Sequence, residues 1–216
     1  MDYLEIEGKE QLKCFGIPVN DSILLKGDEI PEEITYPCVL KGQILSGKRG
    51  KAGAVRVVKS EEELKEVKKI IEEITINGKH MEGVIACGFL PIAEEYYIGM
   101  TLDVKNRSMV MIFTPFGGME IEELAATTPE KLLYFDCTKG FQGEHFRKEL
   151  LKFELSEERM DAVTDIAAKL ANACFALDAT TIEINPLAVL EDGSLLAIDA
   201  KLVIDDNSLV RQGDYT

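Results

Sequence analysis

The stretch Leu40-Lys41-Gly42-Gln43-Ile44-Leu45-Ser46-Gly47-Lys48-Arg49-Gly50-Lys51-Ala52-Gly53 joins an apolar run to a basic, glycine-rich turn. Glycines let backbone N–H groups approach oxyanions closely, and the Lys and Arg side chains supply positive charge. Lys41, at the end of the expected strand, can reach a phosphate while its aliphatic stem packs. The stretch therefore predicts a phosphate-binding loop between two strands. A solvated basic turn is the alternative interpretation, because this is not a P-loop sequence.

Size and charge limit the possible functions. The chain has 216 residues, of which 46% are hydrophobic and 29% charged, which is typical of a globular protein with one core or two small lobes. A formal net charge of -15 argues against binding to nucleic acid or to an anionic membrane. The sequence has no apolar run near the roughly 20 residues that span a bilayer and no signal-peptide pattern at its start, so we expect a cytoplasmic protein.

The five cysteines and two histidines do not form a metal-binding or disulfide pattern. The cysteines are odd in number, widely scattered and without Cys-x-x-Cys spacing, so we expect each to be a small buried side chain. His80 and His145 lie in polar stretches and are expected at the surface. Neither is expected to carry a phosphoryl group.

Strand and helix signals alternate along the chain. Helices are predicted at 5–15, ending at Gly16, at the segment opened by the capping pair Ser60 and Glu63, and at 160–177 behind the cap Ser156. Strands are predicted at 37–40, 54–58, 83–86, 96–104 and 109–113. This interleaving predicts an α/β or α+β domain.

A second group of polar residues is predicted on a hairpin near the C-terminus. Strand alternation places Glu183 and Asn185 on one face of a strand, and a further strand ends at Asp199. A two-residue loop would send Asn185 to the other face, whereas a three-residue loop, 191–193 with Gly193 left-handed, pairs Asn185 with Asp199. We predict the three-residue loop. The oxygens of these residues then suit Mg2+, although polar ends of surface strands are the alternative. With the basic loop they are expected to make one nucleotide pocket.

Six short motifs, in the same order along the chain, carry a resemblance to a known family. They are 15–19 (FGIPV), the 41–53 loop, 92–97 (IAEEYY), 117–122 (GGMEIE), 182–187 (IEINPL) and 205–211 (DDNSLVR). Through them the chain resembles, from end to end, the ATP-grasp part of the β subunit of succinyl-CoA synthetase.

The resemblance implies an ATP-grasp fold for residues 1–216. It implies a small lobe at 21–90, a large lobe at 1–20 plus 91–216, and mixed or antiparallel sheets that enclose a nucleotide cleft. Lys41, Lys48, Arg49, Gly50, Cys87, Leu90 and Glu95 would take nucleotide-contacting positions, Asn185 and Asp199 would be the Mg2+ ligands, and Glu183 would act in catalysis near an incoming phosphohistidine.

The implied activity needs partner chains. In the family, ATP or GTP phosphorylates a His on an α subunit that also holds the coenzyme A site, and the phosphoryl group then passes to a carboxylic acid that becomes a thioester. The sequence given ends at Thr216, where the family continues into a second domain; a separate chain that supplies this domain is one expectation, and a longer protein of which this sequence is a part is the other. The chain alone is not expected to make a thioester.

Two departures from the family leave two functions open. Lys48 replaces a glycine of the phosphate loop, and Cys87 replaces a nucleotide-contacting glutamate, whose two strong acceptors a thiol cannot supply. The first function is that of an ATP-grasp subunit of an acid–thiol ligase, which Lys41, Glu95, Asn185 and Asp199 favour. The second is that of a non-catalytic nucleotide-binding or regulatory module.

Overall fold

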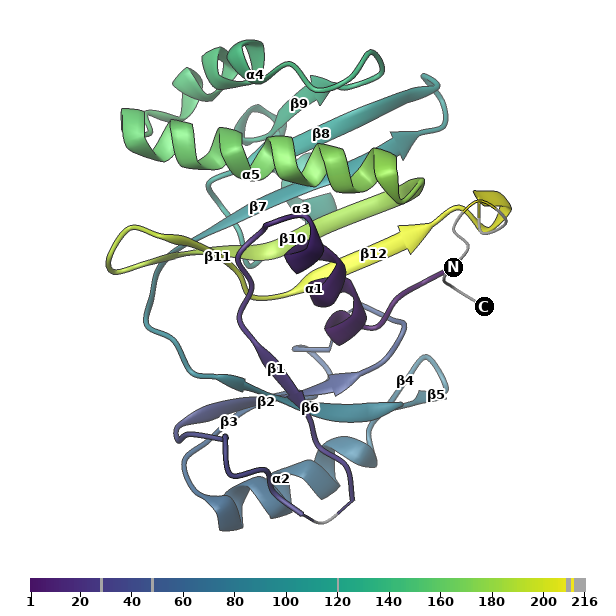
Figure 1. Cartoon of the computed structure of the whole chain (residues 1–216), viewed down its shortest axis with the longest axis vertical. Helices are drawn as coiled ribbons and strands as arrows, with labels where there is room; N and C mark the ends of the chain where they lie inside the picture. Colours follow the sequence, from purple (N-terminus) through teal and green to yellow (C-terminus); the bar gives the residue numbers. More distant parts are fainter. Residues whose placement is uncertain (28, 48, 120, 209–210, 212–216) are drawn as a thin grey trace. The chain divides into compact units, whose positions relative to one another are not determined.

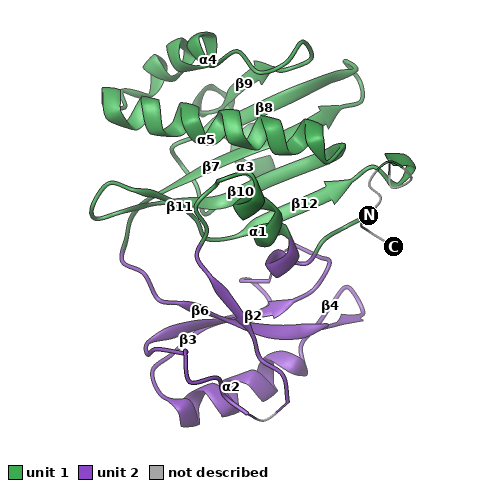
Figure 2. Cartoon of the chain, in the orientation of Figure 1, with its two compact units in different colours: residues 1–3, 8–19, 92–216 green, residues 4–7, 20–91 purple. Residues whose placement is uncertain are grey.

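The computed structural model describes residues 1–27, 29–47, 49–119, 121–208 and 211. These form two compact units, coloured separately in Figure 2: unit 1 comprises 1–3, 8–19 and 92–216, and unit 2 comprises 4–7 and 20–91. The lobes expected from the sequence differ from these units in residues 4–7, 20 and 91. Strands and helices interleave along the chain, which confirms the predicted α/β class (Figure 1).

Unit 2 is built on an antiparallel sheet. Its described strands lie in the order β1 (Ser22–Leu24), β6 (Gly83–Gly88), β2 (Cys38–Gln43) and β3 (Val55–Val58). Helix α2 (Glu61–Glu72) packs on one face of this sheet, and the short strands β4 (Thr75–Ile76) and β5 (Lys79–His80) form a separate hairpin. Strand β2 runs on through Gln43, so the prediction that Lys41 ends this strand is wrong: Lys41 pairs with Val55 and Ile85 inside the sheet.

The start of α2 confirms most of the predicted capping box. The Ser60 hydroxyl accepts a hydrogen bond from the Glu63 N–H at 3.3 Å, which satisfies one of the free donors of the first turn. The Glu63 carboxylate accepts at 2.7 Å from the N–H of Lys59, one residue before the cap, where the predicted motif would use the N–H of Ser60.

Unit 1 is built on a longer antiparallel sheet. Its described strands lie in the order β11 (Leu195–Ala197), β10 (Ala179–Leu190), β7 (Ile92–Asp103), β8 (Ser108–Thr114) and β9 (Leu133–Asp136), and β12 (Ala200–Ile204) also pairs with β10. Figure 1 shows α5 (Glu157–Ala176) and α4 (Gly143–Glu149) along one face of this sheet. Unit 1 also contains α3 (Ile121–Thr127) and the 3-10 turns η1 (Pro129–Lys131), η2 (Leu150–Phe153) and η3 (Asp206–Ser208).

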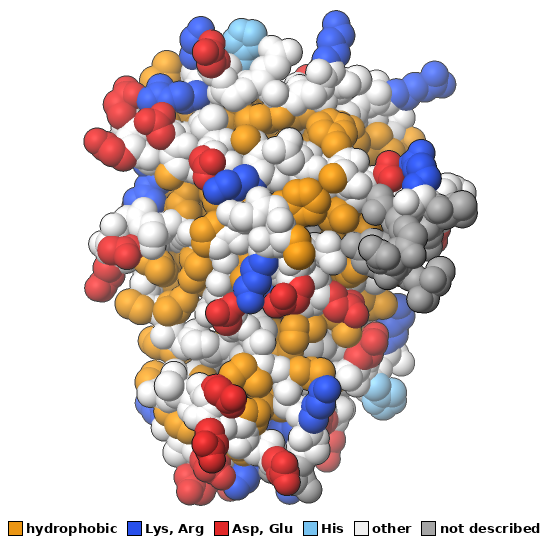
Figure 3. All heavy atoms as spheres, in the orientation of Figure 1, with side chains coloured by type: hydrophobic (Ala, Val, Ile, Leu, Met, Phe, Trp, Pro, Cys, Tyr) orange, Lys and Arg blue, Asp and Glu red, His pale blue; other side chains and the backbone are white. Residues whose placement is uncertain are grey.

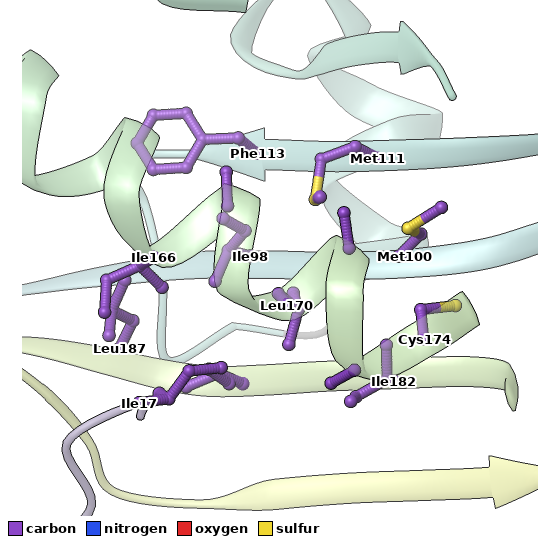
Figure 4. Packing of buried hydrophobic residues seen from close by; sticks show 14 of the residues in the cluster. Ile17, Ile98, Met100, Met111, Phe113, Ile166, Leu170, Cys174, Ile182 and Leu187 are labelled. Carbon is purple, nitrogen blue, oxygen red and sulfur yellow. The ribbon is translucent and has the colours of Figure 1, made fainter. Parts of the chain in front are cut away.

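The core of unit 1 lies between the sheet and α5. Figure 4 shows Ile98 and Phe113 of the sheet turned toward Ile166 and Leu170 of the helix, and all four are at most 3% exposed. Full burial of each such side chain contributes about 1.5–3 kcal/mol. The packing fixes the central strands β7 and β10, which carry the polar residues described below.

Helix α1 (Glu5–Cys14) ends as predicted. Gly16 adopts a left-handed φ of +75°, and its N–H donates to the Lys13 carbonyl at 2.9 Å. The N–H of Ile17 donates to the Leu12 carbonyl at 3.0 Å, so the last carbonyls of the helix are satisfied before Pro18. The first turn of α1 belongs to unit 2 and the remainder to unit 1.

The surface is acidic and carries both signs of charge. Figure 3 shows Asp and Glu side chains interspersed with Lys and Arg over the visible face of the described residues. None of the helices in the described parts of the chain combines the length and apolar character needed to cross a bilayer. His80 and His145 are exposed, as predicted.

The cysteines divide into four buried side chains and one exposed side chain. Cys14 is exposed on α1, so the prediction of burial is wrong for this residue; it follows the buried Leu12 by two positions, which puts the two on different faces of a helix with 3.6 residues per turn. Cys38, Cys87, Cys137 and Cys174 are buried as predicted.

Native thiol labelling is expected to show one fast-reacting cysteine. Burial raises the pKa of Cys38 and Cys137 to about 11 and that of Cys174 to about 12, which lowers the fraction of reactive thiolate. A disulfide reagent at pH 8 should therefore label Cys14 quickly and the others only on unfolding. Cys14→Ser should remove the fast phase. A fast phase of unchanged size in this variant would show that a buried thiol is accessible.

Candidate functional site

The predicted phosphate-binding cations of unit 2 converge on one buried carboxylate. Glu5, in the first turn of α1, receives the Lys41 ammonium at 2.8 Å on Oε1 and the Arg49 guanidinium at 2.7 Å on Oε2. The Glu5 side chain is 1% exposed, against 7% for Lys41 and 11% for Arg49. The structure therefore brings Lys41 and Arg49 together, and it adds a residue that the sequence had not indicated.

This cluster holds both cations in place. All three side chains are nearly buried, and in such a setting opposite charges attract more strongly than in water. The Arg49 guanidinium also donates to the Gly42 carbonyl at 3.2 Å, which fixes its orientation. An acidic residue in a helix first turn normally indicates only a favourable interaction with the helix dipole, so the sequence carried no signal for the burial of Glu5.

The turn that follows Arg49 is closed by backbone hydrogen bonds. Gly53 adopts a φ of +74° and donates to the Gly50 carbonyl at 3.0 Å, while the N–H of Ala54 donates to the Arg49 carbonyl at 3.0 Å. Gly50 is exposed, and a Cβ there would meet no atom within 4 Å. Lys48, also predicted to bind phosphate, lies outside the described residues.

The three predicted nucleotide-contacting positions outside the loop differ in exposure. Cys87 in β6 is 2% exposed, with its Sγ 3.4 Å from the Ser22 hydroxyl, and Leu90 is half-buried; both belong to unit 2. Glu95 in β7 of unit 1 is exposed. The buried Cys87 thiol cannot reproduce the acceptors of a carboxylate at this position.

The hairpin of unit 1 has the predicted register. The 191–193 loop is closed by a 2.9 Å hydrogen bond from the Leu190 N–H to the Ser194 carbonyl, and Gly193 has a φ of +84°. The ladder pairs that flank Asn185 and Asp199 are Leu187–Ala197 and Ile184–Ala200. Both pairs share one register, so the prediction of a three-residue loop is confirmed and Asn185 stands opposite Asp199.

Asn185 and Asp199 supply oxygens of the kind that Mg2+ prefers. The Asn185 Oδ1 accepts from the Gly118 N–H at 2.9 Å, and its second lone pair is suited to a cation; the Asp199 carboxylate accepts from the N–H of Ala200 at 2.8 Å. In the described part of the chain no three His, Cys, Asp or Glu side chains gather as a metal-binding group. Two oxygen donors fit Mg2+, which usually keeps waters and substrate phosphates as its other ligands.

Glu183 lies beside this pair with its own hydrogen-bond donor. The Tyr97 hydroxyl donates to Glu183 Oε2 at 3.0 Å, and Lys201 Nζ lies 3.9 Å from Oε1. The pKa of Glu183 is raised, chiefly because its carboxylate is buried. The nearby Asp199 carboxylate also raises this pKa, whereas Lys201 and the hydrogen bond from Tyr97 lower it. Burial also raises the pKa of Tyr97, so this hydroxyl remains a donor at neutral pH. The sequence did not predict this contact of Tyr97, because an aromatic residue in a strand is ordinary.

The contact between Tyr97 and Glu183 depends on the glycine beneath it. Gly99 pairs with Glu183 across the strands, and a Cβ at this position would lie 2.6 Å from the Tyr97 hydroxyl oxygen and 3.0 Å from the Glu183 Cβ. Gly99→Ala is therefore expected to lower the free energy of unfolding by about 1–3 kcal/mol, the usual cost of overpacking. Urea denaturation would measure this.

The control removes only the hydroxyl. In a Tyr97→Phe background the cost of Gly99→Ala should become smaller, because the closest approach, 2.6 Å to the hydroxyl oxygen, is gone, while those to the Glu183 Cβ at 3.0 Å and the ring Cζ at 3.1 Å remain. An equal cost in both backgrounds would contradict the steric role of the hydroxyl, and stabilisation by Gly99→Ala would contradict the close approach altogether.

Known proteins are similar to this chain in sequence and in fold. A family model described as "ATP-grasp domain" matches residues 2–189. The chain is 36% identical over 233 residues to the β subunit of ADP-forming succinate–CoA ligase from Chlorobaculum tepidum, and 36% identical over 221 residues to a subunit of ADP-forming sulfoacetate–CoA ligase from Bilophila wadsworthia. Both matches cover 100% of this chain but only 59% and 58% of the relatives.

Solved structures show the same fold at lower identity. A chain of the dinucleotide-forming acetyl-coenzyme A synthetase 1 from Ca. Korarchaeum cryptofilum matches with a TM-score of 0.75 and 20% identity, covering 94% of this chain and 93% of that one. ATP citrate lyase from Methanothrix soehngenii matches with a TM-score of 0.74 and 22% identity, covering 99% of this chain and 53% of that one. With the family match over most of its length, the chain belongs to the ATP-grasp domain family.

Proposed function

We propose that this chain is the nucleotide-binding part of an ADP- or GDP-forming acid–thiol ligase, working in the cytoplasm. In this role it uses Mg-ATP or Mg-GTP to phosphorylate a His on a partner α subunit that also holds the coenzyme A site. The grouping of Glu183, Asn185 and Asp199 on the β10 hairpin is the observation that carries the proposal most strongly, because phosphoryl transfer needs a metal site beside a group that receives the nucleophile.

Each group of residues has a separate task. Lys41 and Arg49 bind phosphate oxygens, and Glu95 contacts the nucleotide. Asn185 and Asp199 hold Mg2+, which when bound neutralises charge on the phosphates.

Glu183 receives the partner's imidazole. Its Oε1 accepts the imidazole N–H, so that the other ring nitrogen points away from the carboxylate, while Tyr97 holds Oε2. Without the Glu183 carboxylate, the partner's imidazole would therefore lose the acceptor that orients it.

The relatives support this proposal and leave the acid open. One relative is named for succinate and another for sulfoacetate at the same 36% identity, so the identities do not select one carboxylic acid. The chain spans about three fifths of the length of these relatives, and the remaining domain would come from a further segment or a separate chain.

A nucleotide-binding or regulatory module is the second candidate. The buried Cys87 favours it, because the nucleoside end of the ligand would lack a carboxylate contact at that position.

Reconstitution distinguishes the two functions. The chain would be combined with an α subunit and the second β domain, and incubated with γ-labelled ATP or GTP and Mg2+. The ligase predicts acid-labile, base-stable label on a His of the α subunit. Absence of label with both nucleotides, in a preparation that still binds Mg-nucleotide, would favour the module.

A further inference from the structure

The short segment 117–119 ties together two residues of the proposed site. The Gly117 N–H donates to the backbone carbonyl of Glu95 at 2.6 Å. The Asn185 amide forms hydrogen bonds with the next two residues. Its Oδ1 accepts from the Gly118 N–H at 2.9 Å, and its Nδ2 donates to the Met119 carbonyl at 3.1 Å. The segment therefore joins the strand that carries Glu95 to the amide of the proposed metal ligand.

The two hydrogen bonds of Asn185 also set which way its amide faces. Oδ1 meets an N–H and Nδ2 meets a carbonyl, so only this orientation satisfies both backbone groups. The position of segment 117–119 therefore sets the direction in which the second lone pair of Asn185 Oδ1 points. A shift of Gly118 would move the oxygen that is proposed to bind the cation.

Gly118 also makes room for the Glu95 carboxylate. Its φ of +70° is in the left-handed region, and a Cβ built on it would overlap Oε2 of Glu95. The carboxylate thus rests over the hydrogen of this glycine. A larger residue must push the carboxylate aside or move the backbone that Asn185 holds.

We propose that Gly118 is a positioning residue that couples the nucleotide-contacting Glu95 to the metal-binding Asn185, through the space it leaves for the carboxylate and the N–H it gives to the amide. This inference rests on the proposed function. If Gly118 were needed only for its turn conformation, replacing it would lower the stability of the chain and leave ligand binding unchanged.

The test compares two glycines with the same kind of backbone strain. Gly140, in the same unit, has a φ of +92°, and a Cβ there would meet nothing within 4 Å. Gly118→Ala and Gly140→Ala should therefore both lower the melting temperature. Calorimetric titration with Mg-ADP should show about 10-fold to 100-fold weaker binding for Gly118→Ala, the usual loss on disturbing the support of a metal ligand, and unchanged binding for Gly140→Ala.

A second background isolates the carboxylate. In Glu95→Ala the space over Gly118 is open, so adding Gly118→Ala should weaken Mg-ADP binding by less than about threefold further. If Gly118→Ala alone does not fold, the double variant should, and failure of both to fold would overturn the steric explanation. The explanation would also be overturned if Gly118→Ala bound Mg-ADP as tightly as the wild type. It would be overturned as well if Gly118→Ala weakened Mg-ADP binding by the same factor in the Glu95→Ala background as in the wild type. Absence of Mg-ADP binding by the wild-type chain would instead count against the proposed function.

Discussion

Replacing Glu5 with alanine is expected to lower the free energy of unfolding by about 3–5 kcal/mol, the range for removing one partner of a buried ion pair. Lys41 and Arg49 lie 2.8 and 2.7 Å from this carboxylate and are nearly buried, so the variant removes a negative charge that both cations face. Their repulsion and lost solvation account for the size of the effect. Urea denaturation, followed by circular dichroism, measures it.

An exposed glutamate on the same helix supplies the control. Glu10 pairs with Lys13 at 3.3 Å, and its side chain is 62% exposed, so Glu10→Ala should change the stability by no more than about 0.5 kcal/mol. A cost below about 1 kcal/mol for Glu5→Ala would contradict the buried cluster. Added pyrophosphate should partly rescue Glu5→Ala, because an anion can replace the lost negative charge.

Asp199→Ala is expected to reduce labelling of the partner His by about a hundredfold or more, while the fold survives. Asp199 is the charged oxygen donor of the proposed Mg2+ site, and phosphoryl transfer depends on neutralising the phosphate charge and on position. The labelling would be measured with γ-labelled nucleotide in the reconstituted complex, and circular dichroism would establish that the variant is folded.

A second aspartate of the same hairpin separates metal binding from hairpin stability. Asp192 in the loop accepts from the Ser194 N–H at 2.9 Å and from its hydroxyl at 2.7 Å, at the opposite end of the hairpin from Asn185 and Asp199. Asp192→Ala should therefore destabilise the loop and leave labelling near the wild-type level. Unchanged labelling in Asp199→Ala would remove this residue from the metal site.

Local chemistry made the hairpin and the helix ends predictable. Asp192-Gly193 between two alternating strands indicates a tight turn, and the left-handed Gly193 selects the three-residue loop that places Asn185 opposite Asp199. Gly16 followed by Pro18 ends α1 for a similarly local reason, since the required backbone conformation and the missing N–H are properties of these residues themselves.

Tertiary contacts decided what could not be predicted. The end of the apolar run suggested that a strand stops at Lys41, but pairing with both neighbours carries β2 through Gln43. The burial of Glu5 depends on two cations that lie 36 and 44 positions along the chain, and no local pattern encodes such a meeting. The exposure of Cys14 depends in the same way on which face of α1 is covered.

Titration of the wild-type chain with Mg-ATP, Mg-ADP and Mg-GTP by calorimetry tests most directly the claim that this domain binds a magnesium nucleotide. We expect saturable binding of at least one of the three, weakened when EDTA removes Mg2+ and weakened again in Lys41→Ala. Absence of binding for all three nucleotides in the presence of Mg2+ would contradict this claim.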